Sequence, residues 1–335
     1  MDSGNGFLHV MGARPNYMKV APLYEKIGGL LVHTGQHYDP AMCDDLLAEL
    51  GLKPTHRLST TAVPEMVRGI EDIIRKNDVH RVIVYGDTDS TLAGAVAGHN
   101  RRNVSLVHVE AGLRSGDWSM PEERNRYIID HLADKHFTTT MGAVNTLVSE
   151  GIPMYTANNV GNLMIDTLVK FLPHTGQCRK IGSYALMTLH RPSNVDDHTR
   201  LRSILRQVEQ LPLPVVWVVH PRLQVSLCDH GNVTWIRPQS YLEFLSLEKC
   251  ATVVITDSGG VQEETTYLGV PCLTLRPNTE RPVTVTYGTN TLIEPDQLVE
   301  KVDQILAGRG KAAWPIPLWD GHTASRIAEA LCVTH

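Results

Sequence analysis

TVVITDSGGVQEE, residues 252–264, carries the clearest indication of the fold class. Its first five residues form an apolar, β-branched run. This run is followed by Asp257, then by a Ser-Gly-Gly turn, and then by a helical pattern that extends to Leu268. An apolar run without alternation predicts a strand buried on both faces, as in a parallel sheet covered by helices. Strand, glycine turn and helix in succession therefore predict one βα unit.

The same succession recurs along the chain, for example after RVIVYG (81–86) and VVWVVH (215–220). Strands are expected at Phe7–Met11, Arg81–Tyr85, Ser105–Val109, Ala185–Leu189, Val215–Val219, Val233–Ile236, Thr252–Thr256 and Cys272–Leu275. Alternating strands and helices predict an α/β fold with doubly wound parallel sheets.

Length predicts about two domains, because 335 residues exceed one typical core. We expect an N-terminal Rossmann-like domain over residues 1–165 and a C-terminal one over 166–318. A C-terminal helix at about 319–335 could pack back on the first domain. The polar segment Phe171–Ser183 is expected to be a linker or surface loop.

Composition excludes several classes of protein. A net charge of -5 argues against a nucleic-acid-binding surface across the whole chain. No apolar run is long enough for a membrane span, and the N-terminus lacks the pattern of a secretory signal. The six cysteines are scattered without a CxxC pair. We therefore expect no disulfide framework and no zinc knuckle, and a cytoplasmic location.

Known motifs for other chemistries are absent. The histidines lack the spacing of a metal site, so no metal is expected. There is no Walker A loop, no GxSxG elbow, and no GxGxxG after the first strand. A nicotinamide dehydrogenase and an α/β-hydrolase both lose support.

Polar residues follow the predicted strands where each strand ends. They are Arg14, Asp87, Glu110, His190, His220, Asp257 and Ser258. Each alone could begin a solvated loop or cap a helix. Because ligands of parallel sheets bind outside the carboxyl ends of the strands, the whole set predicts one cleft shared by both halves.

The turn after the strand at 252–256 predicts a phosphate site. Ser258, Gly259 and Gly260 precede a helix whose free N–H groups and dipole suit a diphosphate. Glu264, further into that helix, could hydrogen-bond a ribose diol. The alternative is an ordinary N-cap.

Two cations, Arg14 and Lys19, lie in GARPNYMK (12–19) beside the first strand end. They could offset diphosphate charge, although Lys19 could equally be a solvated helix residue.

Three carboxylates, Asp87, Glu110 and Glu122, could form one group. Mutual repulsion and burial would raise at least one pKa, as acid–base work near neutral pH requires. The alternative for Glu122 and its neighbours in PEERNR (121–126) is a surface salt-bridge network.

Taken together, these motifs resemble the bacterial non-hydrolysing UDP-N-acetylglucosamine 2-epimerase family. The stretches that match, in family order, are GARPNYMKVAPL (12–23), TGQHYDPAM (34–42), YGDTDSTLAGAVAG (85–98), HVEAGLRSGD (108–117), PEERNR (121–126), HFTTT (136–140), VGNLMIDTL (160–168), TLHRPSNVDD (188–197), TDSGGVQEE (256–264), LGVPCLTLR (268–276) and TERPVTVTYGTN (279–290).

The resemblance implies a GT-B-like fold of two Rossmann-like domains with the active cleft between them. It implies an isomerase that interconverts UDP-gluco- and UDP-manno-configured 2-amino sugars, by anti elimination of UDP and re-addition through a glycal. It also implies that the enzyme needs no cofactor and forms a homodimer. Neither nucleic acid nor a membrane is expected as a partner.

The resemblance assigns roles residue by residue. Its catalytic residues match Asp87, Glu110, Glu122 and His190. Its substrate-binding positions match Arg14, Lys19, Arg126, His220, Phe244, Ser258, Gly259, Gly260, Glu264 and Arg281. Which carboxylate is the base and which the acid stays open.

The chain departs from the family pattern at HRPSN (190–194), where many bacterial members have a second Arg followed by Glu. In those members the region lines an allosteric UDP-N-acetylglucosamine site, of which Gln36 and His37 could be a remnant. The chain is also short in the interdomain segment. Whether the substrate is N-acetylated or a free amine stays open.

Three other functions compete with this one. A hydrolysing 2-epimerase would release UDP and N-acetylmannosamine. A GT-B glycosyltransferase would use the same UDP cleft with an acceptor. A catalytically dead nucleotide-sugar-binding regulator is disfavoured, because Asp87, Glu110, Glu122 and His190 occur together.

Overall fold

The computed structural model describes residues 6–36, 40–176, 178, 182–219 and 231–332. The chain divides into two compact units. The N-terminal domain comprises Met1–Val169 and Pro317–His335, and the C-terminal domain comprises Lys170–Ile316.

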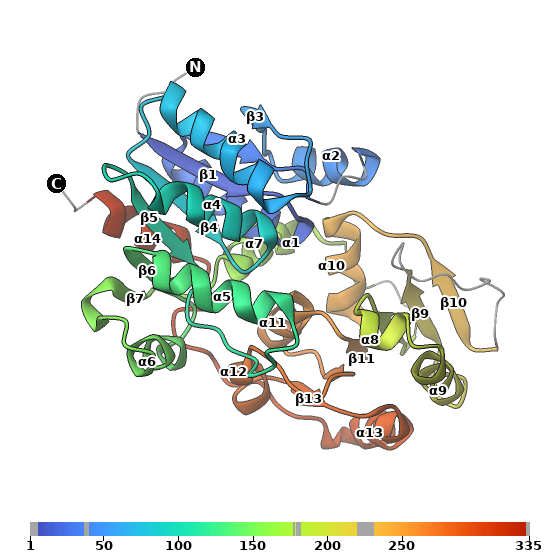
Figure 1. The fold of residues 1–335 in the computed structure, drawn as a ribbon. Helices are drawn as coiled ribbons and strands as arrows, with labels where there is room; N and C mark the ends of the chain where they lie inside the picture. The colour runs from blue at the N-terminus through green and yellow to red at the C-terminus, as the bar shows by residue number, and fades with distance from the viewer. Residues whose placement is uncertain (1–5, 37–39, 177, 179–181, 220–230, 333–335) are drawn as a thin grey trace. The chain divides into compact units, whose positions relative to one another are not determined.

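A seven-stranded sheet forms the N-terminal domain, in the order β3-β2-β1-β4-β5-β6-β7 (Figure 1). Its described strand pairings are all parallel. The strands are β1 (Phe7–Met11), β2 (Leu30–His33), β3 (His56–Arg57), β4 (Arg81–Tyr85), β5 (Ser105–Val109), β6 (Lys135–Thr138) and β7 (Ala157–Asn159).

The helices of this domain connect successive strands. They are α1 (Arg14–Ile27), α2 (Pro40–Glu49), α3 (Val63–Lys76), α4 (Asp89–His99), α5 (Pro121–Leu132), α6 (Met141–Ser149) and α7 (Leu163–Phe171), with a 3-10 turn η1 (Met154–Thr156).

The last helix, α14 (Thr323–Cys332), belongs to the N-terminal domain. The buried Asp166 carboxylate accepts the N–H groups of Thr323 and Ala324 at 3.1 and 2.7 Å and so caps its first turn. At the other end Lys135 Nζ donates to the Ala330 carbonyl at 2.7 Å, a cation at the negative end of the helix dipole.

The C-terminal domain has a six-stranded parallel sheet in the order β10-β9-β8-β11-β12-β13. Its strands are β8 (Ala185–Thr188), β9 (Val215–Val218), β10 (Val233–Ile236), β11 (Val253–Thr256), β12 (Cys272–Thr274) and β13 (Asn290–Leu292). Its helices are α8 (Pro192–Val195), α9 (His198–Val208), α10 (Tyr241–Cys250), α11 (Gly259–Leu268), α12 (Pro282–Thr286) and α13 (Leu298–Gln304), with short turns η2 (Leu172–His174), η3 (Pro295–Gln297) and η4 (Ile305–Arg309).

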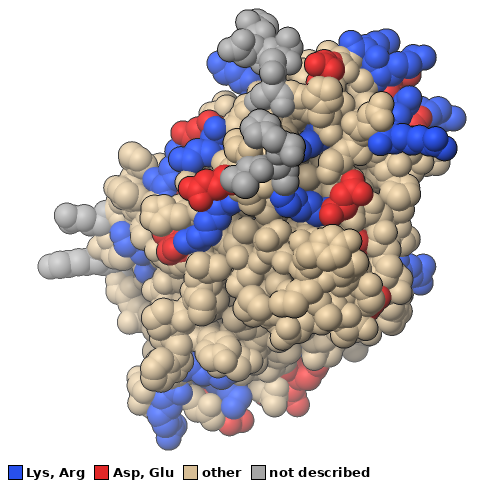
Figure 2. Space-filling model, turned by 90° about the vertical axis from the view of Figure 1, so that its left-hand side faces the viewer, with Lys and Arg blue, Asp and Glu red and all other residues tan. Residues whose placement is uncertain are grey.

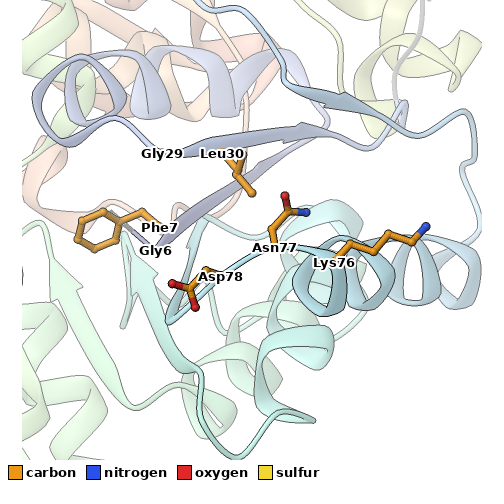
Figure 3. A pocket seen from close by; sticks show the side chains of 7 residues that line it. All are labelled: Gly6, Phe7, Gly29, Leu30, Lys76, Asn77 and Asp78. Atoms are coloured by element: carbon orange, nitrogen blue, oxygen red, sulfur yellow. The ribbon is translucent and has the colours of Figure 1, made fainter. Parts of the chain in front are cut away.

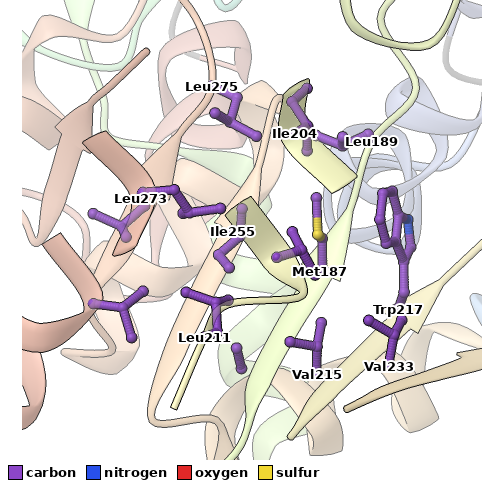
Figure 4. Close-up of a cluster of buried hydrophobic side chains, with 14 of the residues drawn as sticks. Met187, Leu189, Ile204, Leu211, Val215, Trp217, Val233, Ile255, Leu273 and Leu275 are labelled. Carbon is purple, nitrogen blue, oxygen red and sulfur yellow. The ribbon is translucent and has the colours of Figure 1, made fainter. Parts of the chain in front are cut away.

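Strand β8 shows why an unbroken apolar run was needed. Ala185 and Met187 enter one core cluster, with Trp217 and Ile255 (Figure 4), while Leu186 enters another on the opposite face. Successive side chains point to opposite faces, so a strand with helices on both sides must be apolar throughout. The prediction of two doubly wound parallel-sheet domains is confirmed.

The expectation about cysteines is wrong in one respect. The structure joins Cys178, after η2, to Cys250, the last residue of α10, in a disulfide. The two residues are 72 positions apart in sequence, so no short Cys spacing could reveal the pair. Five strands were also missed, β2, β3, β6, β7 and β13, which are short and carry polar residues.

Two surface features of the described residues concern membranes and nucleic acids. None of their helices has the length and apolarity to cross a bilayer. The face in Figure 2 carries both signs of charge beside a broad uncharged area. This face therefore offers no continuous basic stripe of the kind that binds a nucleic-acid backbone.

Candidate functional site

Each sheet has one point at which the strand order reverses. In the N-terminal domain it lies between β1 and β4, and in the C-terminal domain between β8 and β11. Loops leave such a point in opposite directions and open a crevice at the carboxyl ends of the strands. Arg14 and Asp87 follow the first pair of strands, and His190 and Asp257 follow the second.

Two carboxylates of the N-terminal domain each lie against a cation. Lys19 of α1 pairs through Nζ with Glu110, and both side chains are buried. Arg126 of α5 places Nη2 2.5 Å from Oδ2 of Asp87. Lys19 is therefore no solvated helix residue, and a cation stands beside each carboxylate where mutual repulsion of carboxylates was expected.

Gly86 lets these groups approach the backbone. Its φ of 68° lies in the left-handed region, and a β-carbon there would come within 3.0 Å of Lys19 Nζ. Any side chain at this position would be strained and would press on the Lys19 ammonium.

Glu110 also has left-handed backbone, with φ at 71°. Such a conformation costs of order 1–3 kcal/mol in a non-glycine residue and must be held by its surroundings. The N–H groups of Glu110 and Ala111 both donate to the Phe137 carbonyl, at 2.9 and 3.1 Å. The Glu110 carboxylate is thus fixed by its own backbone as well as by Lys19.

A buried network supports the same loop. His108 Nδ1 lies 2.6 Å from the Asp130 carboxylate, while Nε2 lies 2.8 Å from the Gly86 carbonyl. Arg114 Nη2 and the Gly112 N–H also contact Asp130, at 2.8 and 3.1 Å. Burial alone would raise the pKa of Asp130, but His108 and Arg114 hold it below its usual range. The network ties the β4 and β5 loops together.

The two acidic residues in the first turn of helix α5 differ in burial and in their contacts. Glu122, in its first turn, is half-buried, and Glu123 is buried. Glu123 accepts the N–H groups of Ser115 and Gly116 and pairs with Arg126 Nη1 at 2.6 Å. PEERNR is therefore not a solvated network, because Glu123 and Arg126 are both buried.

The outer residues of this domain differ in placement. Arg14 is half-buried at the first residue of α1. Gln36 accepts the N–H and hydroxyl of Ser90 at 3.0 and 2.7 Å and so anchors the start of α4. His37 lies outside the described residues.

In the C-terminal domain, His190 is bound to Asp257. The imidazole Nδ1 lies 2.8 Å from Asp257 Oδ1, and its side chain is 39% exposed while that of Asp257 is fully buried. His220 lies outside the described residues.

The guanidinium of Arg281 packs against the N-terminus of α11. Ser258 is its N-cap but gives no side-chain cap, so the first-turn N–H groups stay available in the way that anion sites require. Gly259 and Gly260 are half-buried. A β-carbon at Gly259 would come within 2.3 Å of Arg281 Nη1, so glycine lets the guanidinium lie on the helix end.

Arg281 is buried within an ionic cluster. Its Nε lies 2.9 Å from Glu263, and its Nη1 pairs with Glu280. Arg276 Nη2 reaches Glu280 at 2.7 Å, and Arg191 approaches the same carboxylate at 3.7 Å.

Glu264 is buried in α11 and accepts a hydrogen bond from the Tyr241 hydroxyl at 2.8 Å. Burial raises its pKa to about 7, against the lowering effect of Tyr241 and with a raising effect of Glu263. Burial and the Glu264 charge also raise the pKa of Glu248 well above its usual range. Glu248 is thus a second buried acid whose pKa depends on the charge of Glu264.

Phe244 of α10 is half-buried and packs against the apolar cluster of Tyr184, Val254 and Val261. Part of its ring therefore belongs to the domain core.

A separate small pocket of about 220 Å³ lies at the other edge of the N-terminal sheet. Gly6, Phe7, Gly29 and Leu30 line it at the amino ends of β1 and β2, together with residues 76–78, the last residue of α3 and the two that follow it (Figure 3). It is remote from the strand ends that carry the candidate residues. Among the described residues, no group of three His, Cys, Asp or Glu could hold a metal ion.

Several contributing residues escaped the sequence reasoning. They are Asn125, Asn194, Tyr241, Glu263, Arg276 and Glu280. Tyr241 stands in none of the motifs quoted above. The others stand inside them, which was the available signal: Asn125, Asn194, Glu263, Arg276 and Glu280.

Comparison with known proteins gives one answer. The family model for UDP-N-acetylglucosamine 2-epimerase matches residues 24–332. The UDP-N-acetylglucosamine 2-epimerase of Methanococcus maripaludis is 33% identical, over 95% of this chain and 96% of its own. A UDP-2,3-diacetamido-2,3-dideoxy-D-glucuronate 2-epimerase of Pseudomonas aeruginosa is 37% identical, over 97% of this chain and 98% of its own.

Solved structures agree with the sequence comparison. The UDP-GlcNAc 2-epimerase of Methanocaldococcus jannaschii, in complex with UDP-GlcNAc and UDP, has a TM-score of 0.87 and 35% identity, with 97% of this chain and 98% of that one covered. The GT-B-like fold and the resemblance read from the motifs are both confirmed. The chain belongs to the UDP-N-acetylglucosamine 2-epimerase family, whose members act on UDP-sugars.

Proposed function

We propose that this chain is a non-hydrolysing UDP-amino-sugar 2-epimerase, an isomerase that inverts C2 of UDP-N-acetylglucosamine or UDP-glucosamine. The observation that carries the proposal is the placement of Asp87 and Glu110, two carboxylates at neighbouring strand ends, each beside a cation. Epimerisation needs one group to remove a proton and one to return it, and these carboxylates supply both.

The reaction is an elimination followed by an addition. A carboxylate takes the proton from C2, the C–H electron pair forms the C1–C2 double bond, and the bond from C1 to the UDP oxygen breaks. UDP leaves with that electron pair and a glycal remains. Return of a proton to the opposite face of C2, with re-addition of UDP at C1, gives the epimer. Asp87, Glu110 and Glu122 carry the proton transfers in this proposal.

The C-terminal domain holds UDP in the same proposal. The α11 N-terminus, with Ser258, Gly259 and Gly260, and the guanidinium of Arg281 suit a diphosphate. Glu264 accepts from the ribose hydroxyls and Phe244 stacks on the uracil.

The remaining assigned residues complete the proposal. His190 stabilises the charge on the departing diphosphate. Arg14 contributes to diphosphate binding, while Lys19, Arg126 and His220 hold the substrate or its carboxylates. Gln36 and His37 are the remnant of an allosteric site that lacks its Arg-Glu pair at 192–193.

Proton NMR in D₂O tests the proposal. The protein is incubated separately with UDP-N-acetylglucosamine, UDP-glucosamine and the UDP-diacetamido-glucuronate named for the P. aeruginosa relative. A manno-configured UDP-sugar with deuterium at C2 and without free UDP supports the epimerase and selects the substrate. Free UDP with a reducing sugar would move the protein to the hydrolysing class. No exchange at C2 with any of them would contradict the proposal and favour a transferase or a binding protein.

A homodimer is part of the proposal. Large apolar side chains are exposed around α5, including Trp118, Tyr127 and Ile128, which are 55%, 37% and 43% exposed. Such groups favour a protein contact. Sedimentation equilibrium tests this, and a concentration-independent monomer mass would contradict it.

Action in the cytoplasm is also proposed. The Cys178–Cys250 disulfide is of a kind rare in that compartment. The redox state of the pair in cell extract, trapped with an alkylating reagent, tests this placement.

A further inference from the structure

Asp257 is a buried carboxylate that receives four donors from one turn. The residue follows β11, and its side chain has no exposed surface. The backbone N–H of His190 lies 3.1 Å from Oδ1, and that of Arg191 lies 3.0 Å from Oδ2. Asn194 Nδ2 donates to Oδ2 at 3.0 Å, and His190 Nδ1 lies 2.8 Å from Oδ1.

The charge state of this carboxylate is fixed by those donors. Burial alone would raise the pKa of Asp257, but the hydrogen bond and charge of His190, with Asn194 and the Arg191 N–H, lower it to about 2. Asp257 is therefore ionised across the working pH range and can only accept hydrogen bonds. His190 Nδ1 must then carry a proton.

The geometry orients the imidazole. With Nδ1 directed at the buried Asp257, Nε2 lies on the opposite side of the ring, and the side chain is 39% exposed. An imidazolium in that position can offset developing negative charge.

We infer that Asp257 is a positioning residue for His190: its carboxylate accepts the Nδ1–H, fixes the orientation of the ring and balances the charge of an imidazolium, whose Nε2–H faces the oxygen of UDP as the C1–O bond breaks. No proton need be transferred, because the electron pair stays on the UDP oxygen and the imidazolium stabilises its charge. The inference rests on the proposed function for the identity of the leaving group.

The test compares Asp257→Asn with a matched control, Asn194→Ala. The amide introduced by Asp257→Asn would keep an acceptor for the backbone N–H groups but would turn an NH₂ toward His190 Nδ1, so the neutral ring would carry its proton on Nε2. Asn194→Ala removes a donor to the same carboxylate and to the Leu275 carbonyl, without touching the ring. It therefore loosens the turn and leaves the His190–Asp257 contact in place.

Two measurements are made on the full chain. Steady-state kinetics should show a loss of kcat of about 100-fold or more in Asp257→Asn, with KM and UDP affinity changed by only a few fold, because the neutral ring of the variant offsets less charge on the departing UDP than an imidazolium does. Asn194→Ala should lose thermal stability but keep kcat within a few fold.

The second measurement is ¹⁵N NMR of histidine-labelled protein, with the His190 signal assigned by its loss in His190→Gln. The wild type should carry a proton on Nδ1 of His190, and Asp257→Asn should carry it on Nε2 when neutral.

The outcomes separate the inference from the proposed function. Equal losses of kcat in both variants, or a wild-type ring without Nδ1–H, would overturn the role of Asp257. A wild type without epimerase activity would instead refute the proposed function, and the NMR would still decide whether Asp257 sets the ring. Because the wild-type spectrum alone tests the tautomer, unfolding of Asp257→Asn would not remove the test.

Discussion

Arg126 joins Asp87 to Glu123: its Nη2 lies 2.5 Å from Asp87 Oδ2 and its Nη1 2.6 Å from Glu123 Oε2. Glu123 is itself held by the N–H groups of Ser115 and Gly116. The buried Glu123 therefore fixes the position of the guanidinium, and the guanidinium fixes that of the Asp87 carboxylate. A carboxylate held in this way has a fixed orientation, as proton transfer to one face of a sugar carbon requires.

The carboxylates themselves give the first prediction. Asp87→Asn and Glu110→Gln should abolish turnover, because the amides keep the shape of the side chains but cannot take up a proton. UDP affinity by calorimetry should stay within a few fold, since neither carboxylate is among the proposed UDP contacts, most of which belong to the other domain. Asp72→Asn, on an exposed part of α3, is the control and should keep full activity. Loss of UDP affinity in both variants would place these carboxylates in the nucleotide site.

Arg126 gives the second prediction. Arg126→Met should lower the free energy of unfolding by about 3 kcal/mol, because it leaves the buried Glu123 without its cation. It should also lower kcat at least about tenfold, because Asp87 loses its orienting partner. Urea unfolding and initial rates measure the two effects. Arg124→Met, at an exposed neighbour on the same helix, should change neither, and equal effects of both variants would contradict the role given to Arg126.

Much of the fold could be predicted because many of its strands are apolar runs bounded by turns. β4, β5 and β10 occur over the predicted residues, since apolar runs between turns are visible without an alignment. β6 and β7 were missed because His136 and Asn159 interrupt the apolar pattern. His136 tolerates burial since Nε2 meets the Asp130 carbonyl at 2.7 Å, a contact with the preceding helix that the apolar pattern does not reveal.

The positions of the candidate site residues could be predicted from the sequence, but the pairs that their side chains form could not. Strand ends identified Asp87, Glu110, His190 and Asp257, because parallel strands end at one edge of a sheet. That Lys19 pairs with Glu110 depends on side-chain directions between helix α1 and the end of β5, and that His190 pairs with Asp257 depends on those at the ends of the neighbouring strands β8 and β11. Sequence order carries no signal for such contacts.

Glu264 gives a prediction about pH. Burial raises its pKa to about 7 from 4.5, so the folded chain keeps a proton that the unfolded chain loses between those values. The free energy of unfolding should therefore fall as pH rises through this window, by up to about 3 kcal/mol from this group. Glu264→Gln removes the titration and should be more stable than the wild type at about pH 8, but not at about pH 4.5.

Urea unfolding across this pH range measures the difference. Glu209→Gln, at an exposed carboxylate directly after α9, is the control and should follow the wild type. Some slope should persist in Glu264→Gln, because the pKa of Glu248 is raised as well. An unchanged slope in Glu264→Gln would show that the Glu264 carboxyl is ionised in the folded protein at neutral pH.

The disulfide gives a prediction about stability. Cys178–Cys250 closes a loop with a sequence separation of 72, and a link of this kind typically stabilises a fold by about 2–4 kcal/mol. Cys178→Ser should lower the melting temperature, and dithiothreitol should lower that of the wild type but not of the variant. Cys332→Ser, at an exposed free cysteine, is the control. Non-reducing peptide mapping that finds no 178–250 cross-link would contradict the pairing.

Gly259 links the shape of the α11 N-terminus to nucleotide binding. A β-carbon there would lie 2.3 Å from Arg281 Nη1 and 2.9 Å from Glu280 Oε1, so Gly259→Ala must move the guanidinium off the helix end. UDP affinity should fall about tenfold or more, because a charge-assisted contact to the diphosphate is lost. Gly142→Ala is the matched control: this glycine also lies in the first turn of a helix, and its β-carbon would meet only Thr140 Oγ1, at 3.6 Å. Gly142→Ala should bind UDP like the wild type and be slightly more stable, since alanine favours the helix. Unchanged UDP affinity in Gly259→Ala would mean that Arg281 serves only the ionic cluster with Glu263 and Glu280.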